Sequence, residues 1–513
     1  MNDQLRQRLS LMSHLAFCNP FSRERIELEK QVLGREFVPE TPVAWSYSQS
    51  TPAGRVNIPR LTQAAEHLIN HFRPQINDQS DNELLQDYID VTIYWLLYRY
   101  FVDVPTGAFF DARNVKLHWQ QFEEAYHDYF SEPALRRVSL ADAPHMFACL
   151  TQIRRAFHNI FTYILGESLP AAELRANVWD SVFTNNLRRY YEQLFRRLSN
   201  LPTLITGPSG TGKELIARAI GLSQYIPFDA EAKRFEYQNE CFFPLNLSAM
   251  SETLIESELF GHRKGAFTGA MADREGWLQQ CRPHGAIFLD EIGELVPALQ
   301  VKLLRVVQQR TYARLGESQE RRFEGKIIGA TNRDMSHQIA TGDFREDLYF
   351  RLCADRIHTP SLRQQLDHYP ADLETLVHAL SFRLIGAPCE DFAQQACQWI
   401  QENLGPEYPW RGNIRELEQC VSSILIRGCY LPADTKPPAA KASRESVAVT
   451  AHDSKNVEWL SKIQSGSLTA DQLLQQYCAW VYEKTGSYEA TARQLGLDRR
   501  TVKSKILQCN GEA

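Results

Sequence analysis

Closely spaced cysteine pairs are missing from this sequence of 513 residues. The eleven cysteines are scattered along the chain, and no two of them form a Cys-x-x-Cys pair. Zinc sites with thiolate ligands and disulfide frameworks both depend on such pairs. We therefore expect reduced thiols, the usual state of cysteine in the cytosol.

An N-terminal secretion signal and a membrane-spanning run are also missing. The first residues read MNDQLRQRLSLMSHL and lack an apolar core followed by a cleavage site of small residues. The most apolar stretch, residues 91–104, is shorter than the ~20 residues that cross a bilayer as a helix, and it contains Arg99 and Asp103. We expect a cytoplasmic protein that has no membrane partner.

An excess of positive charge is the third feature that is missing. Acidic residues outnumber basic ones by 62 to 56, which gives a net charge of −6. This balance argues against general coating of nucleic acid, so any DNA contact needs a local basic patch. With 43% hydrophobic and 23% charged residues, the chain is typical of globular domains, and its length allows about two to four of them.

The character of the sequence changes several times along the chain. Residues 1–176 are rich in aromatics with helical periodicity, which predicts a mainly α-helical domain; we expect its role to be regulatory. In residues 177–431 the apolar runs LPTLIT, GAIFLD and GKIIGAT alternate with amphipathic stretches, which indicates an α/β domain with a parallel sheet. Residues 432–456 are poor in large apolar side chains and predict a flexible linker, and residues 457–513 predict a small helical domain.

A glycine-rich loop follows the first of these strands, in the sequence TLITGPSGTGKE. Its glycines let backbone N–H groups turn toward phosphate oxygens, its lysine adds charge for the β and γ phosphates, and the following helix N-terminus favours anions. The pattern G-x-x-x-x-G-K between a strand and a helix predicts an ATP site rather than an ordinary turn. The predicted cofactor-binding residues of this loop are Gly207, Pro208, Ser209, Gly210, Thr211, Gly212, Lys213 and Glu214.

The strand GAIFLD ends in two carboxylates, Asp290 and Glu291. Asp290 can hold Mg²⁺ through water, and Glu291 can orient and polarise the water that attacks the phosphate. An acidic pair at a strand end is often only a helix N-cap, but downstream of a phosphate loop we favour the catalytic role. The sequence therefore predicts an ATPase that uses ATP and Mg²⁺.

Two further segments carry polar residues that are suited to phosphoryl transfer. The strand GKIIGAT is followed by Asn332, whose side chain can sense the γ-phosphate or position the water. The segment FREDLYFRL carries Arg345 and Arg351, and a guanidinium that reaches the developing charge promotes this reaction, often from a neighbouring subunit. From spacing alone, surface salt bridges explain the two arginines equally well.

The segment 256–270 reads ESELFGHRKGAFTGA and contains the hexapeptide GAFTGA. It resembles the surface loop of the AAA+ bacterial enhancer-binding proteins, which activate RNA polymerase that holds sigma-54. Two glycines bracket Phe267 and Thr268, which gives a flexible tip with an exposed aromatic side chain. The resemblance implies that this tip contacts sigma-54, and the predicted contact residues are Gly265, Ala266, Phe267, Thr268, Gly269 and Ala270.

The resemblance also implies an AAA+ P-loop fold, with a helical lid on the parallel sheet, that assembles from dimers into a hexameric ring. It implies that Asn246 pairs with Glu291 and couples the nucleotide state to the hexapeptide loop. Arg345 and Arg351 then act on the ATP of the neighbouring subunit, and Arg415 is a second nucleotide sensor. The predicted catalytic residues are thus Asn246, Glu291, Asn332, Arg345 and Arg351, and Asp290 and Arg415 complete the cofactor-binding set.

This sequence departs from the pattern of the family at several positions. Pro208 stands where the family usually has glutamate, Arg411 takes a usual proline position, and Leu-Ser follows Asn246 in place of Cys-Ala. The stretch Tyr225–Cys241 is longer than usual, as an inserted loop would be, whereas Glu214 is common in the family. None of these changes removes a catalytic group, so we expect an active ATPase.

The C-terminal sequence predicts two helices around a turn at Gly496, the second beginning near Asp498. A helix-turn-helix places the start of its second helix in the major groove, and this unit resembles the Fis-like helix-turn-helix that ends most members of the family. We predict binding to DNA upstream of promoters; a helical hairpin with a solvated basic face is the alternative. The predicted DNA-binding residues are Arg499, Arg500, Thr501, Lys503 and Lys505.

The N-terminal domain has no receiver, PAS or GAF pattern that we can identify. His67 and His71 are four residues apart on a predicted helix and could ligate a metal, but further ligands are not evident and ordinary packing is favoured. The Tyr- and Trp-rich run 88–100 could line an apolar ligand pocket, although a helix core is the better interpretation. The signal that this domain senses is not predicted.

The leading hypothesis is an ATP-dependent activator that remodels sigma-54 RNA polymerase from the closed to the open complex. The alternative is a DNA-binding regulator that acts without sigma-54, with ATP controlling its oligomerisation, but the intact hexapeptide argues against it. A third hypothesis, an ATP-driven remodeller of targets outside transcription, is disfavoured by the basic C-terminal helix.

Overall fold

The computed structural model describes residues 2–39, 56–101, 112–236, 242–432 and 469–509. The chain forms two compact units, residues 1–430 and 431–513, and each unit has its own hydrophobic core. The expected linker, residues 432–456, lies outside the described residues apart from Pro432.

The N-terminal region of the larger unit is helical, as the sequence predicts. Ser22, Asp81 and Asp142 each cap a helix by accepting a backbone N–H of the first turn. The described helices are α1 Asn2–Phe17, α2 Arg23–Leu33, α3 Asn57–Phe72, α4 Asn82–Tyr100, α5 Ala112–Phe130, α6 Ala143–Tyr163 and α7 Leu169–Phe183.

The aromatic run of α4 belongs to the core of this region. Tyr88, Tyr94 and Trp95 are buried, and the cavity beside Tyr94 and Tyr98 has a volume of about 40 Å³. Pockets for organic ligands are usually ~300–1,000 Å³, so this cavity has room for a few waters only. The structure thus agrees with the interpretation of this run as helix core.

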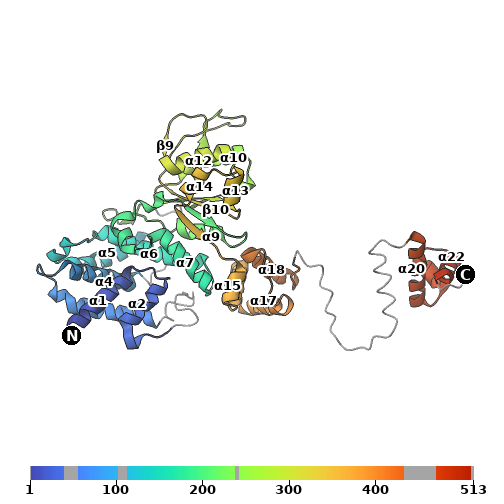
Figure 1. The fold of residues 1–513 in the computed structure, drawn as a ribbon, viewed down its shortest axis with the longest axis horizontal. Helices are drawn as coiled ribbons and strands as arrows, with labels where there is room; N and C mark the ends of the chain where they lie inside the picture. The colour runs from blue at the N-terminus through green and yellow to red at the C-terminus, as the bar shows by residue number, and fades with distance from the viewer. Residues whose placement is uncertain (1, 40–55, 102–111, 237–241, 433–468, 510–513) are drawn as a thin grey trace. The chain divides into compact units, whose positions relative to one another are not determined.

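The second part of the larger unit is built on a parallel sheet of five strands in the order β11-β1-β10-β7-β4 (Figure 1). Its registers pair Leu204 with Gly329, Ile328 with Phe288, and Leu245 with Leu289. This confirms the predicted parallel α/β domain. The strands are β1 Thr203–Thr206, β4 Phe242–Asn246, β7 Ala286–Asp290, β10 Lys326–Thr331 and β11 Asp355–His358.

Helices cover both faces of the sheet (Figure 1). Strand residues alternate between the two faces: Ile205 joins the core that contains α9 and the N-terminal helices, whereas Leu204 joins the core on the opposite face. The helices next to the sheet are α9 Lys213–Gly221 on the first face, and α10 Glu252–Phe260, α12 Pro297–Gln309, α13 Met335–Thr341 and α14 Glu346–Leu352 on the second.

Buried polar side chains of α6 hold the end of α9. Gln152 Nε2 donates to the carbonyl oxygen of Ser223 at 2.9 Å, and Asn159 Nδ2 donates to the Ser223 hydroxyl at 3.1 Å. Arg155 donates to the carbonyl oxygen of Gln224. Because these groups are buried, their loss would leave donors and acceptors without partners. The N-terminal helices are therefore part of the same folded core as the helix that follows the phosphate loop.

The stretch Tyr225–Cys241 contains a short hairpin of β2 Phe228–Asp229 and β3 Arg234–Phe235. The ring of Phe228 lies 4.8 Å from that of Trp119 and 4.7 Å from that of Phe147. Phe235 stacks on Phe147 at 5.9 Å. The hairpin thus packs against the N-terminal helices, which gives a structural reason for the additional length noted in the sequence.

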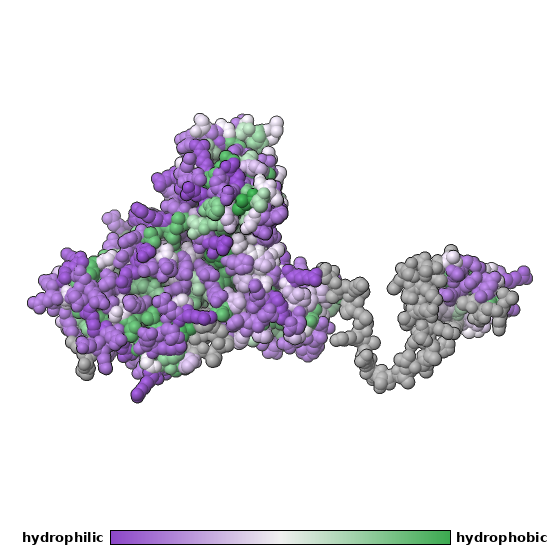
Figure 2. All heavy atoms as spheres, viewed as in Figure 1, coloured by the Kyte–Doolittle hydropathy of each residue, from purple (hydrophilic) through white to green (hydrophobic). Residues whose placement is uncertain are grey.

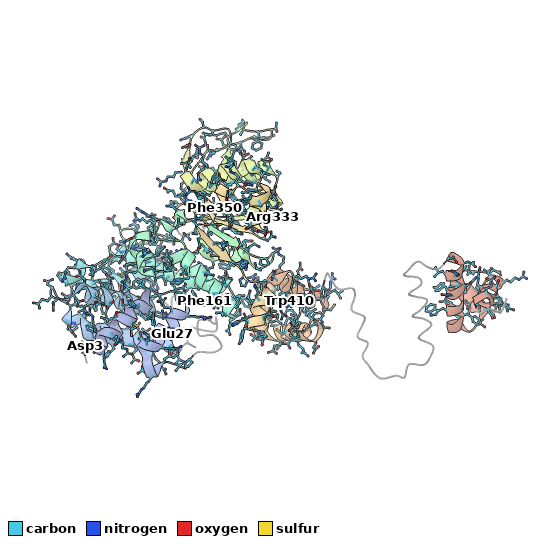
Figure 3. The ribbon with its side chains drawn as sticks, in the orientation of Figure 1. Asp3, Glu27, Phe161, Arg333, Phe350 and Trp410 are labelled. Carbon is cyan, nitrogen blue, oxygen red and sulfur yellow. The ribbon has the colours of Figure 1, made fainter. Side chains whose placement is uncertain are left out.

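The helical lid follows the sheet. It has a small core of its own, in which Trp410, labelled in Figure 3, is buried. The lid helices are α15 Leu362–His368, α16 Asp372–Ile385, α17 Glu390–Asn403 and α18 Asn413–Arg427.

Asp372 connects the lid to the N-terminal helices. Its carboxylate is fully buried and accepts the backbone N–H groups of Glu167 and Ser168, the latter at 2.9 Å. Gly166 has φ of 101°, and a Cβ at this position would lie 2.8 Å from Asp372 Oδ2. Arg175 of α7 donates to the carbonyl oxygen of Gly166 at 2.8 Å. The connection between α6 and α7 is therefore fixed to the lid.

The smaller unit contains three described helices, α20 Ala470–Thr485, α21 Tyr488–Leu495 and α22 Arg499–Cys509. Cys478, Ala492, Val502 and Ile506 form its core. Gly496 ends α21 with φ of 66°, a left-handed conformation that glycine adopts readily. The turn and the start of the last helix lie where the sequence predicts them.

The described surface is mostly hydrophilic in the view of Figure 2. Among the described residues, no helix combines the length and the apolar character that a membrane span requires.

Candidate functional site

The phosphate loop lies between β1 and α9, where the sequence predicts it. Gly207, Gly210 and Gly212 have φ of 143°, 77° and 86°, conformations that glycine allows at little cost. A Cβ on Gly207 would lie 2.1 Å from the hydroxyl of Thr359, which leaves no room for a side chain. Thr359 also contacts the Thr211 hydroxyl at 2.6 Å. Gly207 is therefore required both by the conformation of the loop and by its neighbour Thr359.

Lys213 begins α9, and its side chain is buried. Its Nζ donates to the carbonyl oxygens of Gly207 and Pro208 at 3.2 and 3.1 Å. Burial lowers the pKa of the Lys213 ammonium below its usual value, and the carboxylates of Glu291 and Asp290 oppose the shift. The ammonium thus lies inside the loop, near both predicted acidic residues.

Asp290 and Glu291 stand at the carboxyl end of β7, next to the phosphate loop. Burial raises the pKa of the Asp290 carboxyl, the neighbouring Glu291 raises it further, and Lys213 opposes the shift. Glu291 has a left-handed backbone with φ of 54°, and its Oε2 accepts the backbone N–H of Asn332 at 3.4 Å. A bound cation near Asp290 would favour its charged form.

Asn246 lies at the end of β4 and is paired in register with Asp290. Its Oδ1 accepts the backbone N–H of Ser248 at 3.0 Å and the Ser248 hydroxyl at 2.8 Å. The sheet thus brings Asn246 to the strand next to Glu291, while its side chain bonds locally. The pairing of Asn246 with Glu291 stays a prediction.

Arg345 is the N-cap residue of α14, Arg351 lies in the last turn of this helix, and both side chains are exposed. Arg345 forms an ion pair with Asp347 of the same chain at 2.7 Å. Within a single chain, Arg345 therefore takes part in a surface salt bridge. Exposed ion pairs of this kind contribute at most ~1 kcal/mol, and the guanidinium can exchange its partner. Action on a neighbouring subunit stays a prediction for both arginines.

The lid contacts the phosphate loop through the start of α18. The backbone N–H of Arg415 donates to the carbonyl oxygen of Gly210 at 3.3 Å, and its Nη1 donates to the Ser209 hydroxyl at 3.4 Å. Asn413 Nδ2 donates to the carbonyl oxygen of Ser209 at 2.8 Å. A Cβ on Gly210 would lie 2.1 Å from the carbonyl oxygen of Gly412. The lid and the loop therefore meet at backbone distance.

Some residues around this site were not identified from the sequence. Asn413 has φ of 53°, and asparagine tolerates this conformation better than most residues. The only indication in the sequence that Asn413 belongs to the site was its position two residues before Arg415. Thr359 follows β11 and gave no signal of its own. Arg333, labelled in Figure 3, follows Asn332 and forms an ion pair with Glu294. Glu214, which the sequence does predict as part of the site, pairs with Arg218 at 3.3 Å on the surface of α9.

The hexapeptide forms a surface loop whose base is the short ladder of β5 Gly261–His262 and β6 Arg274–Glu275. Gly265 and Gly269 have φ of 82° and 106°, and no atom lies within 4 Å of a Cβ built on either. The Gly265 N–H donates to the carbonyl oxygen of Ala270 at 2.9 Å, and the Ala270 N–H donates to that of Phe267 at 3.0 Å. Phe267 is 37% exposed, and its ring lies 4.9 Å from that of His262.

The loop is attached to a second hairpin, β8 Thr311–Tyr312 and β9 Arg321–Arg322. The Leu315 N–H donates to the carbonyl oxygen of Gly261 at 2.9 Å, and the Arg263 N–H donates to that of Leu315 at 3.0 Å. Arg263 also pairs with Asp273 at 2.6 Å across the base of the loop. The base is therefore fixed while the tip is open to solvent.

In the smaller unit, the basic residues of α22 divide into two groups. Arg500, Thr501 and Lys503 are exposed, and Arg499 pairs with Glu489 at 3.3 Å while its side chain stays 64% exposed. Lys505 forms an ion pair with Asp471 of α20 and is only 19% exposed. The structure therefore places Lys505 against its own unit rather than beside the exposed group.

Residues 182–358 match the family model described as the sigma-54 interaction domain. This segment is a sigma-54 interaction domain. The sigma-54 interaction domain holds the phosphate loop, the pair Asp290 and Glu291, the hexapeptide, and both Arg345 and Arg351. Arg415 and the basic C-terminal helix lie outside it.

Two curated relatives match beyond this domain. The transcriptional regulatory protein ZraR of Escherichia coli (strain K12) is 37% identical over 311 residues, which cover 60% of this chain and 63% of ZraR. The Nif-specific regulatory protein of Azotobacter vinelandii is 36% identical over 332 residues, which cover 64% of this chain and 58% of that protein. The chain thus spans less than two thirds of the length of these relatives.

Among solved structures, NtrX from Brucella abortus in complex with ATP aligns with 77% of this chain and 86% of its own, at 21% identity and a TM-score of 0.40.

The close approach of Gly210 to the lid predicts the effect of one added methyl group. Gly210→Ala places Cβ against the carbonyl oxygen of Gly412, which forces the lid away from the loop at a cost of roughly 1–3 kcal/mol. We expect ATP to bind at least about tenfold more weakly, as measured by titration calorimetry. Gly342→Ala is the matched control, because Gly342 has φ of 78° and open space around it. Equal affinities of the two variants would contradict the prediction.

Proposed function

We propose that this protein is an ATP-driven activator of transcription that converts closed promoter complexes of sigma-54 RNA polymerase into open ones. The observation that carries the proposal is the exposed tip Phe267–Thr268, on a fixed base, in the same sigma-54 interaction domain as Lys213, Asp290 and Glu291. The chemistry of a phosphate site and a contact surface for a partner are thus present in one domain.

The site is suited to ATP as substrate. Backbone N–H groups of the glycine loop and the Lys213 ammonium would hold the phosphates. Mg²⁺, held through water near Asp290, would neutralise charge on the β and γ phosphate oxygens. The described residues contain no group of three or more His, Cys, Asp or Glu arranged for a metal, which fits an ion held mainly by water and phosphate. Glu291 would orient the attacking water, with Asn332 beside it.

Hydrolysis would take place between subunits of a ring. Arg345 and Arg351 are exposed on α14, as side chains must be if they serve a neighbouring subunit, and charge stabilisation by such arginines is worth ~10³–10⁵ in rate. We propose a hexamer assembled from dimers, in the cytoplasm. The change at Glu291 would pass through Asn246, on the adjacent strand, to the hexapeptide loop.

The basic C-terminal helix would bind DNA upstream of promoters. Arg500, Thr501 and Lys503 lie on one exposed helix that follows a tight turn, the arrangement by which a helix-turn-helix meets phosphates and base edges. Binding of several copies to adjacent sites would raise the local concentration of protomers for ring assembly.

The tip of the loop gives the first test. Thr268→Ala is expected to abolish open-complex formation by sigma-54 RNA polymerase while most of the ATP turnover remains, because Thr268 lies outside the nucleotide site. Both activities are measured on the same preparation, and Thr253→Ala, which removes another exposed hydroxyl on α10, should retain both. Full activation by Thr268→Ala would refute the role of the loop, and activation of the housekeeping polymerase instead would favour a regulator that acts without sigma-54.

The basic helix gives the second test. The double substitution Arg500→Ala, Lys503→Ala should weaken promoter DNA binding and reduce the slope of log K against log salt by about two. Lys505→Ala is the control, since Lys505 is paired with Asp471, and it should leave the slope nearly unchanged. DNA affinity is measured by fluorescence anisotropy at several salt concentrations. A larger effect of Lys505→Ala would mean that the contact surface is misassigned.

We also propose that the N-terminal helices restrain the ATPase. They contact both elements that flank the nucleotide: α6 holds the end of α9, and Asp372 fixes the lid to the start of α7. Movement of the lid relative to the phosphate loop would strain one of these attachments. A signal that loosens them would therefore raise turnover.

Asp372→Asn tests this restraint. The amide keeps the size of the carboxylate but removes one acceptor from the buried N–H groups of residues 167 and 168, so the lid is released. We expect basal ATP turnover to rise about fivefold or more, within the usual range of coupling between sites. The control is Asp367→Asn, an exposed lid residue that pairs with Arg363. Unchanged or lower turnover for Asp372→Asn would show that the contact does not restrain the ATPase.

A further inference from the structure

A buried glutamine connects the segment that follows Glu291 to the helix that carries Arg345 and Arg351. Gln300 lies on α12 and is fully buried. Its Nε2 donates to the carbonyl oxygen of Leu295 at 2.7 Å and to that of Asp343 at 2.9 Å. Its Oε1 accepts the backbone N–H of Arg345 at 2.8 Å.

These three bonds use both donors of the amide and its acceptor. Leu299 and Leu303 beside it on α12 are buried in the apolar core of this face of the sheet, where an aliphatic side chain would fill the space without polar atoms. A buried amide is costly in such surroundings unless its hydrogen bonds are made. Hydrogen bonding to these three backbone groups therefore explains why position 300 holds a glutamine and not an aliphatic residue.

The two ends of this connection have different roles in the proposed reaction. Leu295 follows Glu291 by four residues, after the short turn Ile292–Glu294. Asp343 and Arg345 lead into α14, and Arg345 is its N-cap residue. The Gln300 side chain thus links two segments of one subunit. One segment follows Glu291, which would orient the attacking water, and the other begins with Arg345, which would act on the neighbouring subunit.

We propose that Gln300 is a positioning residue, which sets the start of α14 according to the conformation of the segment after Glu291. The nucleotide state of one subunit then governs the arginines presented to the next subunit of the ring. The inference rests on the proposed function, in which Arg345 and Arg351 act between subunits. Small shifts are sufficient, because a displacement of about 1 Å at a catalytic group can cost about 100-fold in rate.

Gln300→Leu tests the role of the three hydrogen bonds. We expect the kcat for ATP to fall about 10- to 100-fold, with the Kd for ATP nearly unchanged, because the phosphate loop is not touched. Gln338→Leu is the matched control: Gln338 is a buried glutamine of α13 that donates to the carbonyl oxygen of Gly293 at 3.1 Å but leaves the Arg345 N–H alone. It should also lower thermal stability, because a buried hydrogen bond is lost, but keep most of its turnover. Equal kcat losses in the two variants would overturn the proposal.

Mixed rings separate misplaced arginines from a damaged active site. Glu291→Gln subunits cannot hydrolyse ATP but carry intact arginines, whereas Gln300→Leu subunits have an intact site of their own. Mixing the two is expected to give turnover above the sum of the separate preparations, as Arg345→Ala mixed with Glu291→Gln should. The positioning role would be overturned if turnover recovers when Arg345→Ala is mixed with Glu291→Gln but does not recover when Gln300→Leu is mixed with Glu291→Gln.

If Arg345→Ala alone leaves turnover intact, the proposed action between subunits fails, and the inference about Gln300 falls with it. If Gln300→Leu does not fold, Gln300→Met takes its place, since it has a similar length, adapts to irregular core space and makes none of the three hydrogen bonds. A normal kcat for Gln300→Met would then overturn the proposal, and a reduced kcat with recovery in mixed rings would support it.

Discussion

The burial of helix α9 between the sheet and the N-terminal helices is the constraint on which the nucleotide site depends. Ile216, Ala217 and Ile220 of this helix are at most 1% exposed, and burial of one isoleucine side chain contributes about 1.5–3 kcal/mol. The phosphate loop ends where this helix begins, so the direction of Lys213 follows from the packing of the helix. Because α6 supplies part of that packing, the N-terminal helices and the helix that follows the phosphate loop share one core.

The parts of the site that could be predicted from the sequence are those in which chemistry and spacing lie within one short segment. The glycine loop, Asp290–Glu291 and the hexapeptide each have this property, and a parallel sheet then brings the strand ends together. Asp372, Thr359 and Gln300 could not be predicted, because each acts through partners that are between 5 and 205 residues away and looks ordinary in sequence. The ion pair of Lys505 with Asp471 could not be predicted either, because it joins two helices that are not adjacent in the sequence.

The lid and the phosphate loop approach each other most closely between two glycines. Gly210 and Gly412 meet at backbone distance, and Asn413 donates to the loop while its Oδ1 accepts the backbone N–H of Leu362 at the start of α15. A rotation of the lid must therefore move the loop. The N-terminal region contacts both the end of α9 and the lid.

The contacts of the hairpin β2–β3 limit which segments of this chain can be exchanged with those of another protein. Trp119 and Phe147 pack against Phe228 in the middle of the ATPase sequence, so grafting the first 176 residues onto another ATPase would leave two large rings facing water. Any chimaera that contains the N-terminal helices would therefore also need the hairpin. The hairpin and the N-terminal helices therefore form one structural unit, although they are separate in the sequence.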